Sequence, residues 1–158
     1  SERRDRSVKF KVALAAFAAS VCPLAASAAG IEFRSLSDVA VMYDAPSRQA
    51  RQQFVIARQT PVEVVRSQAG WAKVREPGGM LAWVESSALT AQRTAIVTVE
   101  RARVLARAED SAPLVFEAER RVLLEPVPSA EPVAAGWARV KHRDGQSGFI
   151  RISQVWGL

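Results

Sequence analysis

The sequence is poor in the residues that carry covalent chemistry, with one cysteine and one histidine among 158 residues. Cys22 lies in an N-terminal segment expected to be removed, so we predict no disulfide, thiolate nucleophile or cysteine metal ligand in the mature chain. His142 stands between two basic residues at a predicted turn, where no nucleophile is indicated nearby. No phosphate-binding glycine loop occurs. We therefore expect no metal, no cofactor and no catalytic residues.

A strong charge of one sign is also lacking once the N-terminus is set aside. Basic residues outnumber acidic ones by 22 to 16, but five of the basic and two of the acidic residues fall within residues 1–11. The remainder has 17 basic and 14 acidic residues, a charge of +3 with both signs interspersed. Phosphate binding needs a clustered basic face, so we expect no nucleic-acid partner. The 49% hydrophobic content and 24% charge are those of a globular protein.

Residues 1–28 have the parts of an export signal. A basic segment, 1–11, precedes an apolar stretch, 12–22, and the small-x-small motif Ala26-Ser27-Ala28 follows. Cleavage after this motif leaves a mature chain that starts at Ala29. The sequence therefore predicts a signal peptide and a periplasmic protein.

An uncleaved membrane anchor is the alternative interpretation of this segment. Residues 12–31 are twenty consecutive uncharged residues, about enough to cross a bilayer. Nine of the twenty are alanine and Pro23 interrupts them, which disfavours insertion. We therefore expect no stable membrane insertion after cleavage.

The rest of the chain contains an internal repeat. Residues 70–75, Gly-Trp-Ala-Lys-Val-Arg, recur as Gly-Trp-Ala-Arg-Val-Lys at 136–141, an offset of 66. Upstream, residues 41–46 match 104–109 at an offset of 63, which pairs Tyr43 with Ala106. About three extra residues are then expected in the second copy, in the proline-rich segment 126–132.

Each copy has the alternation of short β-strands. Strands are expected at 61–65, 71–75, 81–84, 121–124 and 148–150. No long, capped helical stripe follows Ala29, although 111–121 is expected to form a short turn of helix. Glycine turns at 77–79 and 144–145 mark tight hairpins. Four or five strands in about 55 to 60 residues are typical of a small barrel.

We place the domain division in the short connector between the copies. Residues 29–92 form the first predicted domain and residues 93–158 the second. The connector, residues 90–95, is only six residues long, so the two modules are expected to touch. Trp156, near the chain end, is expected to be a packing anchor.

The order of motifs resembles the bacterial SH3-like domain. The first copy runs through the strand at 70–75, a glycine hairpin, Ala82-Trp83-Val84 and a closing Ser-Ser-Ala-Leu turn at 86–89. The resemblance spans 38–89, and in the second copy it is best over 136–156. It implies an all-β protein of two tandem SH3-like small barrels, preceded by a signal peptide helix.

Aromatic residues are the candidate ligand-binding residues. Strand alternation places Trp71 and Trp83 on the face opposite to the alanines and valines of the same strands. Such rings either lie buried under loops or between the modules, or form a shallow platform for a peptide or sugar ring. The resemblance adds Tyr43 and Asp44 as groove residues. The equivalents of the two tryptophans in the second copy are Trp137 and Phe149. If only one copy binds, we expect the first.

What the resemblance implies is binding without catalysis. Bacterial SH3-like domains accompany cell-wall hydrolases and hold peptidoglycan or its peptide stems, so the expected partner is a cell-wall peptide or glycan. The alternative is an adapter that docks a periplasmic protein through the SH3-like surface. A third class is an enzyme with paired carboxylates, but Glu109, Asp110, Glu117 and Glu119 have the pattern of solvated charges.

Overall fold

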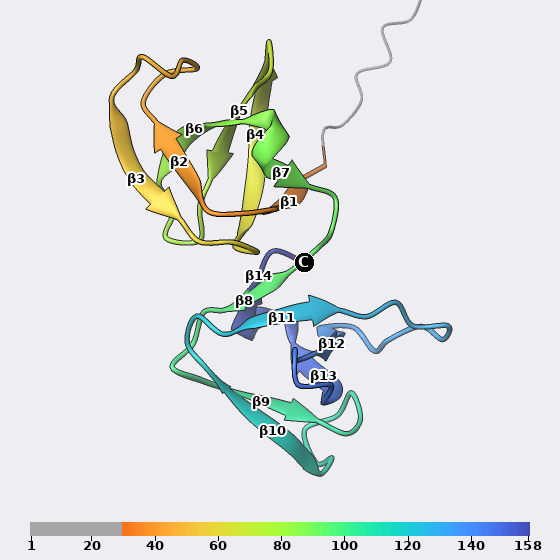
Figure 1. The fold of residues 1–158 in the computed structure, drawn as a ribbon. Coiled ribbons are helices and arrows are strands. Elements are labelled where there is room, and N and C mark those ends of the chain that lie inside the picture. Colours follow the sequence, from red (N-terminus) through yellow and green to blue (C-terminus); the bar gives the residue numbers. More distant parts are fainter. Residues whose placement is uncertain (1–29) are drawn as a thin grey trace, which may run out of the picture.

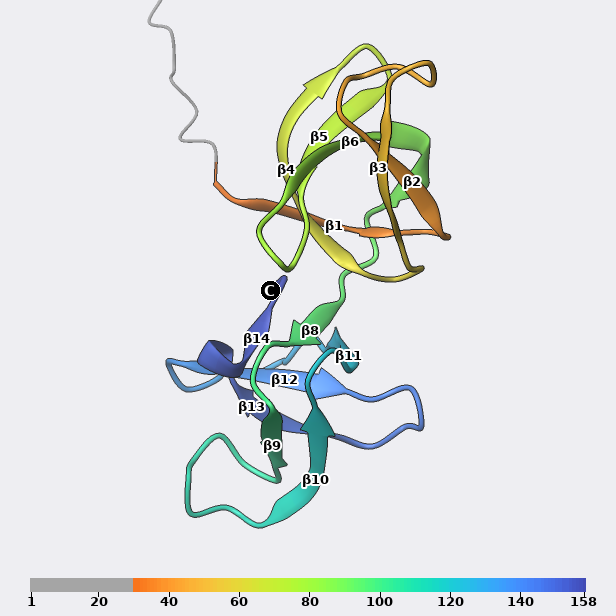
Figure 2. The same cartoon turned by 90° about the vertical axis from the view of Figure 1, so that its left-hand side faces the viewer.

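The computed structural model describes residues 30–158, so the predicted signal peptide at 1–28 lies outside the described residues. Two antiparallel sheets of seven strands each form two modules, one stacked on the other (Figure 1). Each sheet curls around its own core (Figure 2). The expected all-β fold of two tandem modules is confirmed.

The first module contains seven strands and one short 3-10 helix. Their bounds are β1 Glu32–Leu36, β2 Ala40–Tyr43, β3 Gln52–Ile56, β4 Pro61–Gln68, β5 Trp71–Arg75, β6 Leu81–Glu85, η1 Ser86–Ala88 and β7 Leu89–Thr90.

The second module repeats this series. Its elements are β8 Ala95–Val97, β9 Arg101–Leu105, β10 Leu114–Glu119, β11 Leu123–Pro126, β12 Trp137–Lys141, β13 Ser147–Arg151, η2 Ile152–Gln154 and β14 Val155–Trp156. The strand orders are β3-β2-β6-β5-β4-β1-β7 and β10-β9-β13-β12-β11-β8-β14. Strand by strand, the two orders are the same.

Each module has its own apolar core, formed by alternate residues of the strands. In β5 and β6 the inward residues are Ala72, Val74, Ala82 and Val84, all at most 3% exposed. Val140 and Ile150 take the equivalent positions in the second core. The inward faces of β5 and β6 are therefore the ones that alternation in the sequence predicted.

The alignment predicted between β2 and β9, which paired Tyr43 with Ala106, is wrong by one residue. Tyr43 pairs with Trp83 in the first module, and Leu105 pairs with Phe149 in the second. Tyr43 therefore corresponds to Leu105, an offset of 62, and not to Ala106. A one-residue slip moves side chains to the opposite face of a strand, so this correction changes every comparison of β2 with β9.

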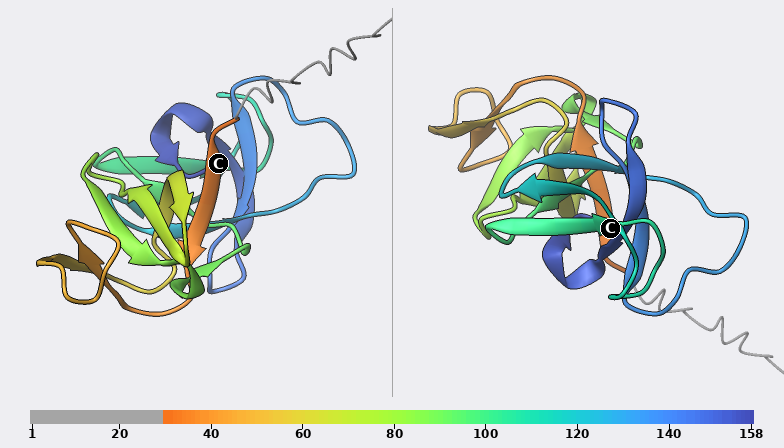
Figure 3. Two further views of the ribbon diagram at one scale, coloured as in Figure 1. Left: turned by 90° about the horizontal axis from the view of Figure 1, so that it is seen from above. Right: turned by 90° about the horizontal axis from the view of Figure 1, so that it is seen from below.

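The extra residues of the second copy lie where the proline-rich segment predicted them. Glu63 pairs with Arg75 and Glu125 with Lys141, so the offset is still 62 at Glu125 and has become 66 at Lys141. Four residues, not three, are therefore added between β11 and β12. The resulting loop projects from the side of the second module (Figure 3).

The prediction of a short turn of helix within residues 111–121 is wrong. Strand β10 occupies Leu114–Glu119 and pairs with β9, with a bulge between Leu114 and Phe116. Inward-facing Ala118, 3% exposed, contributes to the second core, and this burial favours a strand over local helix formation.

The hairpin turns predicted from glycine are confirmed. Gly79 between β5 and β6 has φ +97°, and Gly145 between β12 and β13 has φ +96°. Both lie in the region that residues with a side chain rarely adopt, so glycine is required at these two positions.

The two modules touch through polar and aromatic contacts. Thr94 Oγ1 donates to the Gln59 carbonyl oxygen over 2.6 Å, and Ser35 Oγ lies 2.7 Å from Thr94 Oγ1. A hydroxyl has one hydrogen, so Ser35 is the donor to Thr94. Trp156 meets Phe33 edge-to-face at 4.9 Å between ring centroids. The junction is thus mixed in character, and Trp156 is a packing anchor as expected.

Candidate functional site

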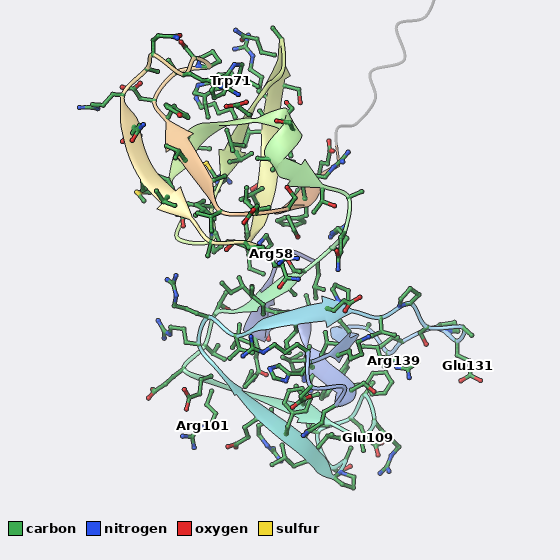
Figure 4. The ribbon with its side chains drawn as sticks, in the orientation of Figure 1. Arg58, Trp71, Arg101, Glu109, Glu131 and Arg139 are labelled. Atoms are coloured by element: carbon green, nitrogen blue, oxygen red, sulfur yellow. The ribbon has the colours of Figure 1, made fainter. Side chains whose placement is uncertain are left out.

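The candidate site lies on the outer face of the first module, where β2, β5 and β6 meet. Trp71 begins β5, at the end of this module that is far from the second one (Figure 4). Tyr43 ends β2 and pairs with Trp83 of β6. Neither tryptophan belongs to the apolar core cluster of the module, so both indoles lie outside it.

Tyr43 and Trp71 form an aromatic pair. Their ring centroids are 5.5 Å apart with an interplanar angle of 88°, the edge-to-face arrangement that aromatic rings prefer. Both side chains are half-buried and keep part of their surface accessible. Trp83, by contrast, is only 8% exposed. The structure therefore offers Tyr43 and Trp71 as contact surface and makes Trp83 the support beneath.

A shallow hollow of about 270 Å³ lies beside this aromatic pair. β2 pairs with β6 only through Tyr43 and Trp83, so the remainder of β2 leaves a space against the end of β6 and η1. Tyr43 lines the hollow and also contacts Trp71, so the hollow and the aromatic pair adjoin, and we call them together the groove. The other lining residues are Val39, Ala40, Val41, Val84, Glu85, Ser87 and Ala88.

An ion pair, which we call the clamp, fixes the loop between β2 and β3 to Glu85 at the end of β6. Arg48 Nε and Nη2 each donate to one oxygen of Glu85 over 2.7 Å, a bidentate arrangement. These hydrogen bonds from Arg48 hold the pKa of the Glu85 carboxyl below its ordinary value. Glu85 is also the cross-strand partner of Trp71, so the clamp holds the loop close to the indole.

Asp44 closes the base of the same loop. Asp44 Oδ1 accepts a hydrogen bond from the Arg51 backbone amide at 3.1 Å, and Oδ2 lies 3.4 Å from Arg51 Nε. Both oxygens thus have partners within the loop. Asp44 therefore holds the two ends of this loop together and is not among the residues that line the hollow.

The equivalent face of the second module is closed. Leu105 replaces Tyr43, and Trp137 is 7% exposed within a small cluster with Leu105 and Ala112. Val133 from the long β11–β12 loop packs against this cluster, as does Phe149. The four inserted residues thus belong to a loop that helps to cover the indole.

An arginine also covers Trp137. Arg151 Cζ stands 4.4 Å from the centroid of the indole ring, a cation–π contact. The same guanidinium makes a bidentate ion pair with Asp110. Of the sequence alternatives, burial under loops therefore describes Trp137, while Trp71 keeps an accessible surface.

The loop clamps of the two modules are equivalent with the charges exchanged. Arg48 corresponds to Asp110 at the offset of 62, and Glu85 corresponds to Arg151 at the offset of 66. These pairs were not predicted, because the offset of 63 aligns Arg48 with Ser111. In the correct register, opposite charges exchange places at matched positions of the two copies. This exchange is a sequence signal that could have predicted the two ion pairs.

The residues in and beside the hollow also differ in the second module. Val41 and its cross-strand partner Val55 become Arg103 and its partner Glu117. Val39, just before β2, and Val55 in β3 are 60% and 61% exposed, an unusual display of apolar surface. In the wall, Ala88 becomes Gln154, whose side-chain oxygen is buried.

The histidine and the acidic residues singled out earlier lie in ordinary surface contacts. His142 Nδ1 is 3.0 Å from Asp144 Oδ2 in the β12–β13 turn. The pKa of Asp144 is lowered, first by a hydrogen bond from the Gln146 amide and then by His142. Glu109 pairs with Arg107. Within residues 30–158, no group of three or more potential ligands is placed to hold a metal ion.

The family model of the bacterial SH3 domain matches this chain twice, over residues 37–90 and 98–157. The chain belongs to this family, and each match falls within one of the two sheets. Among the described residues, no helix has the length and apolarity needed to cross a membrane.

Three solved structures are similar to this chain at low sequence identity. NlpC2 and NlpC1 from Trichomonas vaginalis both align with a TM-score of 0.37, at 12% and 14% identity. The alignments cover 82% of this chain but 49% and 46% of those proteins. An NlpC/P60 family protein from Bacillus cereus ATCC 10987 aligns with a TM-score of 0.35 and 14% identity, covering 79% and 56%. This chain thus spans about half their length. No curated protein matches it.

Proposed function

We propose that the protein is a non-catalytic binding protein of the cell envelope whose first module holds a cell-wall peptide or glycan. The observation that carries this proposal is the open groove of Tyr43, Trp71 and the adjoining hollow of about 270 Å³. Aromatic rings with accessible faces suit both sugar rings and peptide planes. The apolar wall of Val39 and Val41 adds a surface for small side chains.

The second module supports this proposal as an internal comparison. It shares the fold, yet Leu105 stands in place of Tyr43, and Arg151 and Val133 cover Trp137. The two copies therefore differ at the residues proposed to contact the ligand. We infer that the second module has mainly a structural role and that the first one binds.

Sedimentation with purified cell-wall sacculi tests the proposal. The wild-type protein is expected to co-sediment, and Tyr43→Leu, which installs the residue of the second module, is expected to weaken binding. Trp137→Phe is the matched control, because Trp137 is covered and this change keeps an aromatic ring. Equal binding by wild type and Tyr43→Leu would contradict a role for the aromatic groove.

Docking of a protein partner is the second candidate function. The observation that favours it is Val55, which is 61% exposed, together with its half-buried cross-strand partner Val41, because apolar surface patches mark protein interaction sites. An adapter of this kind would stay in the supernatant with purified sacculi. Val55→Glu, which copies Glu117 of the second module, is expected to abolish partner capture and to leave sacculus binding unchanged.

We place the protein in the periplasm and propose that residues 1–28 are its signal peptide. The proposal is supported by the basic segment, the apolar stretch and Ala26-Ser27-Ala28. N-terminal sequencing of periplasmic protein is expected to begin at Ala29. Recovery of a membrane-bound chain that retains Arg3 would contradict the proposal.

A further inference from the structure

A second cleft runs along the junction of the two modules. It consists of two adjoining hollows of about 260 and 210 Å³ that share Pro77, Gly78, Ile96 and Arg121. Pro77 and Gly78 belong to the β5–β6 turn of the first module, whereas Ile96 lies in β8 and Arg121 in the β10–β11 turn. Neither module contains this cleft alone, so it depends on their stacking.

The lining of the cleft is mixed, with apolar residues from both modules beside polar ones such as Thr60 and Thr98. Phe54, Ile56 and Pro77 of the first module face it. Ile96 contributes from the second module, is 6% exposed and lies outside the second core cluster. Together the two hollows reach the lower end of the size of small-ligand sites, about 300 to 1,000 Å³. The cleft therefore has room for a small side chain beside these apolar residues.

Arg121 supplies a cation from an unusual backbone position. The Val122 amide donates to the Glu119 carbonyl oxygen over 3.1 Å, which closes a four-residue turn. Arg121 is the third residue of this turn and has φ +73°, a conformation that favours glycine. An arginine here carries a backbone cost and delivers its side chain to the cleft.

The positive charge at the cleft is available to a ligand. Neither Arg121 nor its neighbour Arg120 forms an ion pair within residues 30–158. Glu76 is the carboxylate that lines the cleft, but its oxygens accept hydrogen bonds from the amides of Gly78 and Met80 at 2.9 and 2.8 Å. Glu76 is therefore engaged within its own turn.

We propose that this cleft binds the C-terminal carboxylate of a short peptide and holds an apolar side chain between its walls. A guanidinium matches the two oxygens of a carboxylate with parallel hydrogen bonds. Arg121 is the anchor, Arg120 adds charge, and Ile96 with Pro77 contacts the side chain. The site uses neither Tyr43 nor Trp71, so it stands independently of the groove in the first module.

A titration with three probes tests the ligand chemistry. N-acetyl-Val-Ala with a free carboxylate is expected to shift the amide NMR signals of Gly78, Ile96 and Arg121 saturably. Its C-terminal amide is expected to bind at least about tenfold more weakly, because charge-assisted hydrogen bonds are lost. Absence of shifts with the free acid overturns the site. Inorganic phosphate binding as tightly as the peptide would overturn the peptide assignment.

Arg121→Gly separates binding from folding. Glycine removes the guanidinium and relieves the positive φ, so the melting temperature is expected to stay the same or rise. Peptide affinity is expected to fall at least about tenfold. Gln59→Gly is the matched control, because Gln59 occupies the equivalent turn of the first module with φ +64°. Undiminished affinity in Arg121→Gly, or an equal loss in Gln59→Gly, would overturn the role of the guanidinium.

Discussion

Trp71 and Trp83 lie on the same face of the first module, but the ring of Trp71 is accessible and that of Trp83 is nearly covered. Trp71 and Trp83 have the same sequence signature, a tryptophan that alternates with small and β-branched residues. Their environments differ, because Trp71 forms an edge-to-face pair with Tyr43 at the end of the module while Trp83 is 8% exposed. Alternation reports which face of a strand a residue occupies. It does not report what covers that face.

Alanine substitutions should separate these two roles. Trp71→Ala is expected to weaken sacculus binding by about 2 kcal/mol or more, with a nearly unchanged melting temperature. Trp83→Ala is expected to cost about 3 to 5 kcal/mol of stability, because a buried ring is removed. Binding and melting measured on the same preparations decide between them. A large fall in the melting temperature of Trp71→Ala would assign this ring to packing.

The clamp residue Glu85 should respond to pH. Because the hydrogen bonds from Arg48 lower the pKa of Glu85 in the folded protein, the clamp is fully formed above the ordinary glutamate value of about 4.3 and opens as the pH falls through the lowered pKa. An NMR titration of the Glu85 carboxyl carbon is expected to give a pKa below the ordinary value. Arg48→Gln should bring the pKa back up, and an unchanged pKa in this variant would show that Arg48 is not its cause.

At the scale of elements, the two clamps allow a direct comparison, because they join the same pair of elements in each module with the charges exchanged. Each clamp joins the loop after β2 or β9 to the end of β6 or β13. Exposed ion pairs of this kind contribute little to stability. We therefore expect each clamp to restrict the motion of its loop and to leave the free energy of unfolding nearly unchanged.

A charge exchange in the first module tests this interpretation. Arg48→Asp alone places like charges together and should increase the motion of the loop between β2 and β3, measured by ¹⁵N relaxation. Arg48→Asp combined with Glu85→Arg copies Asp110 and Arg151 and should restore the wild-type order. If the double variant is as mobile as the single one, the two residues do not act as a pair.

Much of the fold was predictable from the sequence, because turn glycines and alternating strands carry local signals. Gly79 and Gly145 marked both hairpins, and the repeat predicted two modules of one kind. The slip between offsets 63 and 62 arose because β2 and β9 share little beyond apolar character. Only the pairing of Tyr43 with Trp83, and of Leu105 with Phe149, fixes that register.

The candidate site was predictable in part. The face of Trp71 followed from alternation, but its openness depends on contacts between distant residues. Burial of Trp137 requires Arg151 and Val133, which approach it only in the folded module. The hollow beside Tyr43 arises where β2 and β6 diverge, and no local sequence pattern encodes that divergence.

At the scale of the whole molecule, the short connector and the buried hydroxyl pair join the modules. Thr94 and Ser35 are 6% and 1% exposed, and both take part in the hydrogen-bonded chain to the Gln59 carbonyl. A buried hydroxyl without a partner is costly, so this chain ties the two modules in one relative position.

Thr94→Val should therefore weaken the coupling between modules. The variant removes the donor to Gln59 and is expected to lose about 1 to 3 kcal/mol of stability. Wild type is expected to unfold in a single calorimetric transition, since each small barrel gains from the shared contacts. Two separate transitions in the wild type, or halves 29–92 and 93–158 as stable as the whole, would contradict coupled unfolding.

The indole signals of the four tryptophans provide the most direct test of the central claim, that the first module binds cell-wall material and the second does not. Each indole N–H gives one NMR signal, and soluble peptidoglycan fragments can be titrated into the labelled protein. The account predicts that the Trp71 signal shifts saturably while the Trp137 and Trp156 signals stay in place. A shift of Trp137 with Trp71 unmoved, or no shift of any indole at saturating fragment, would contradict it.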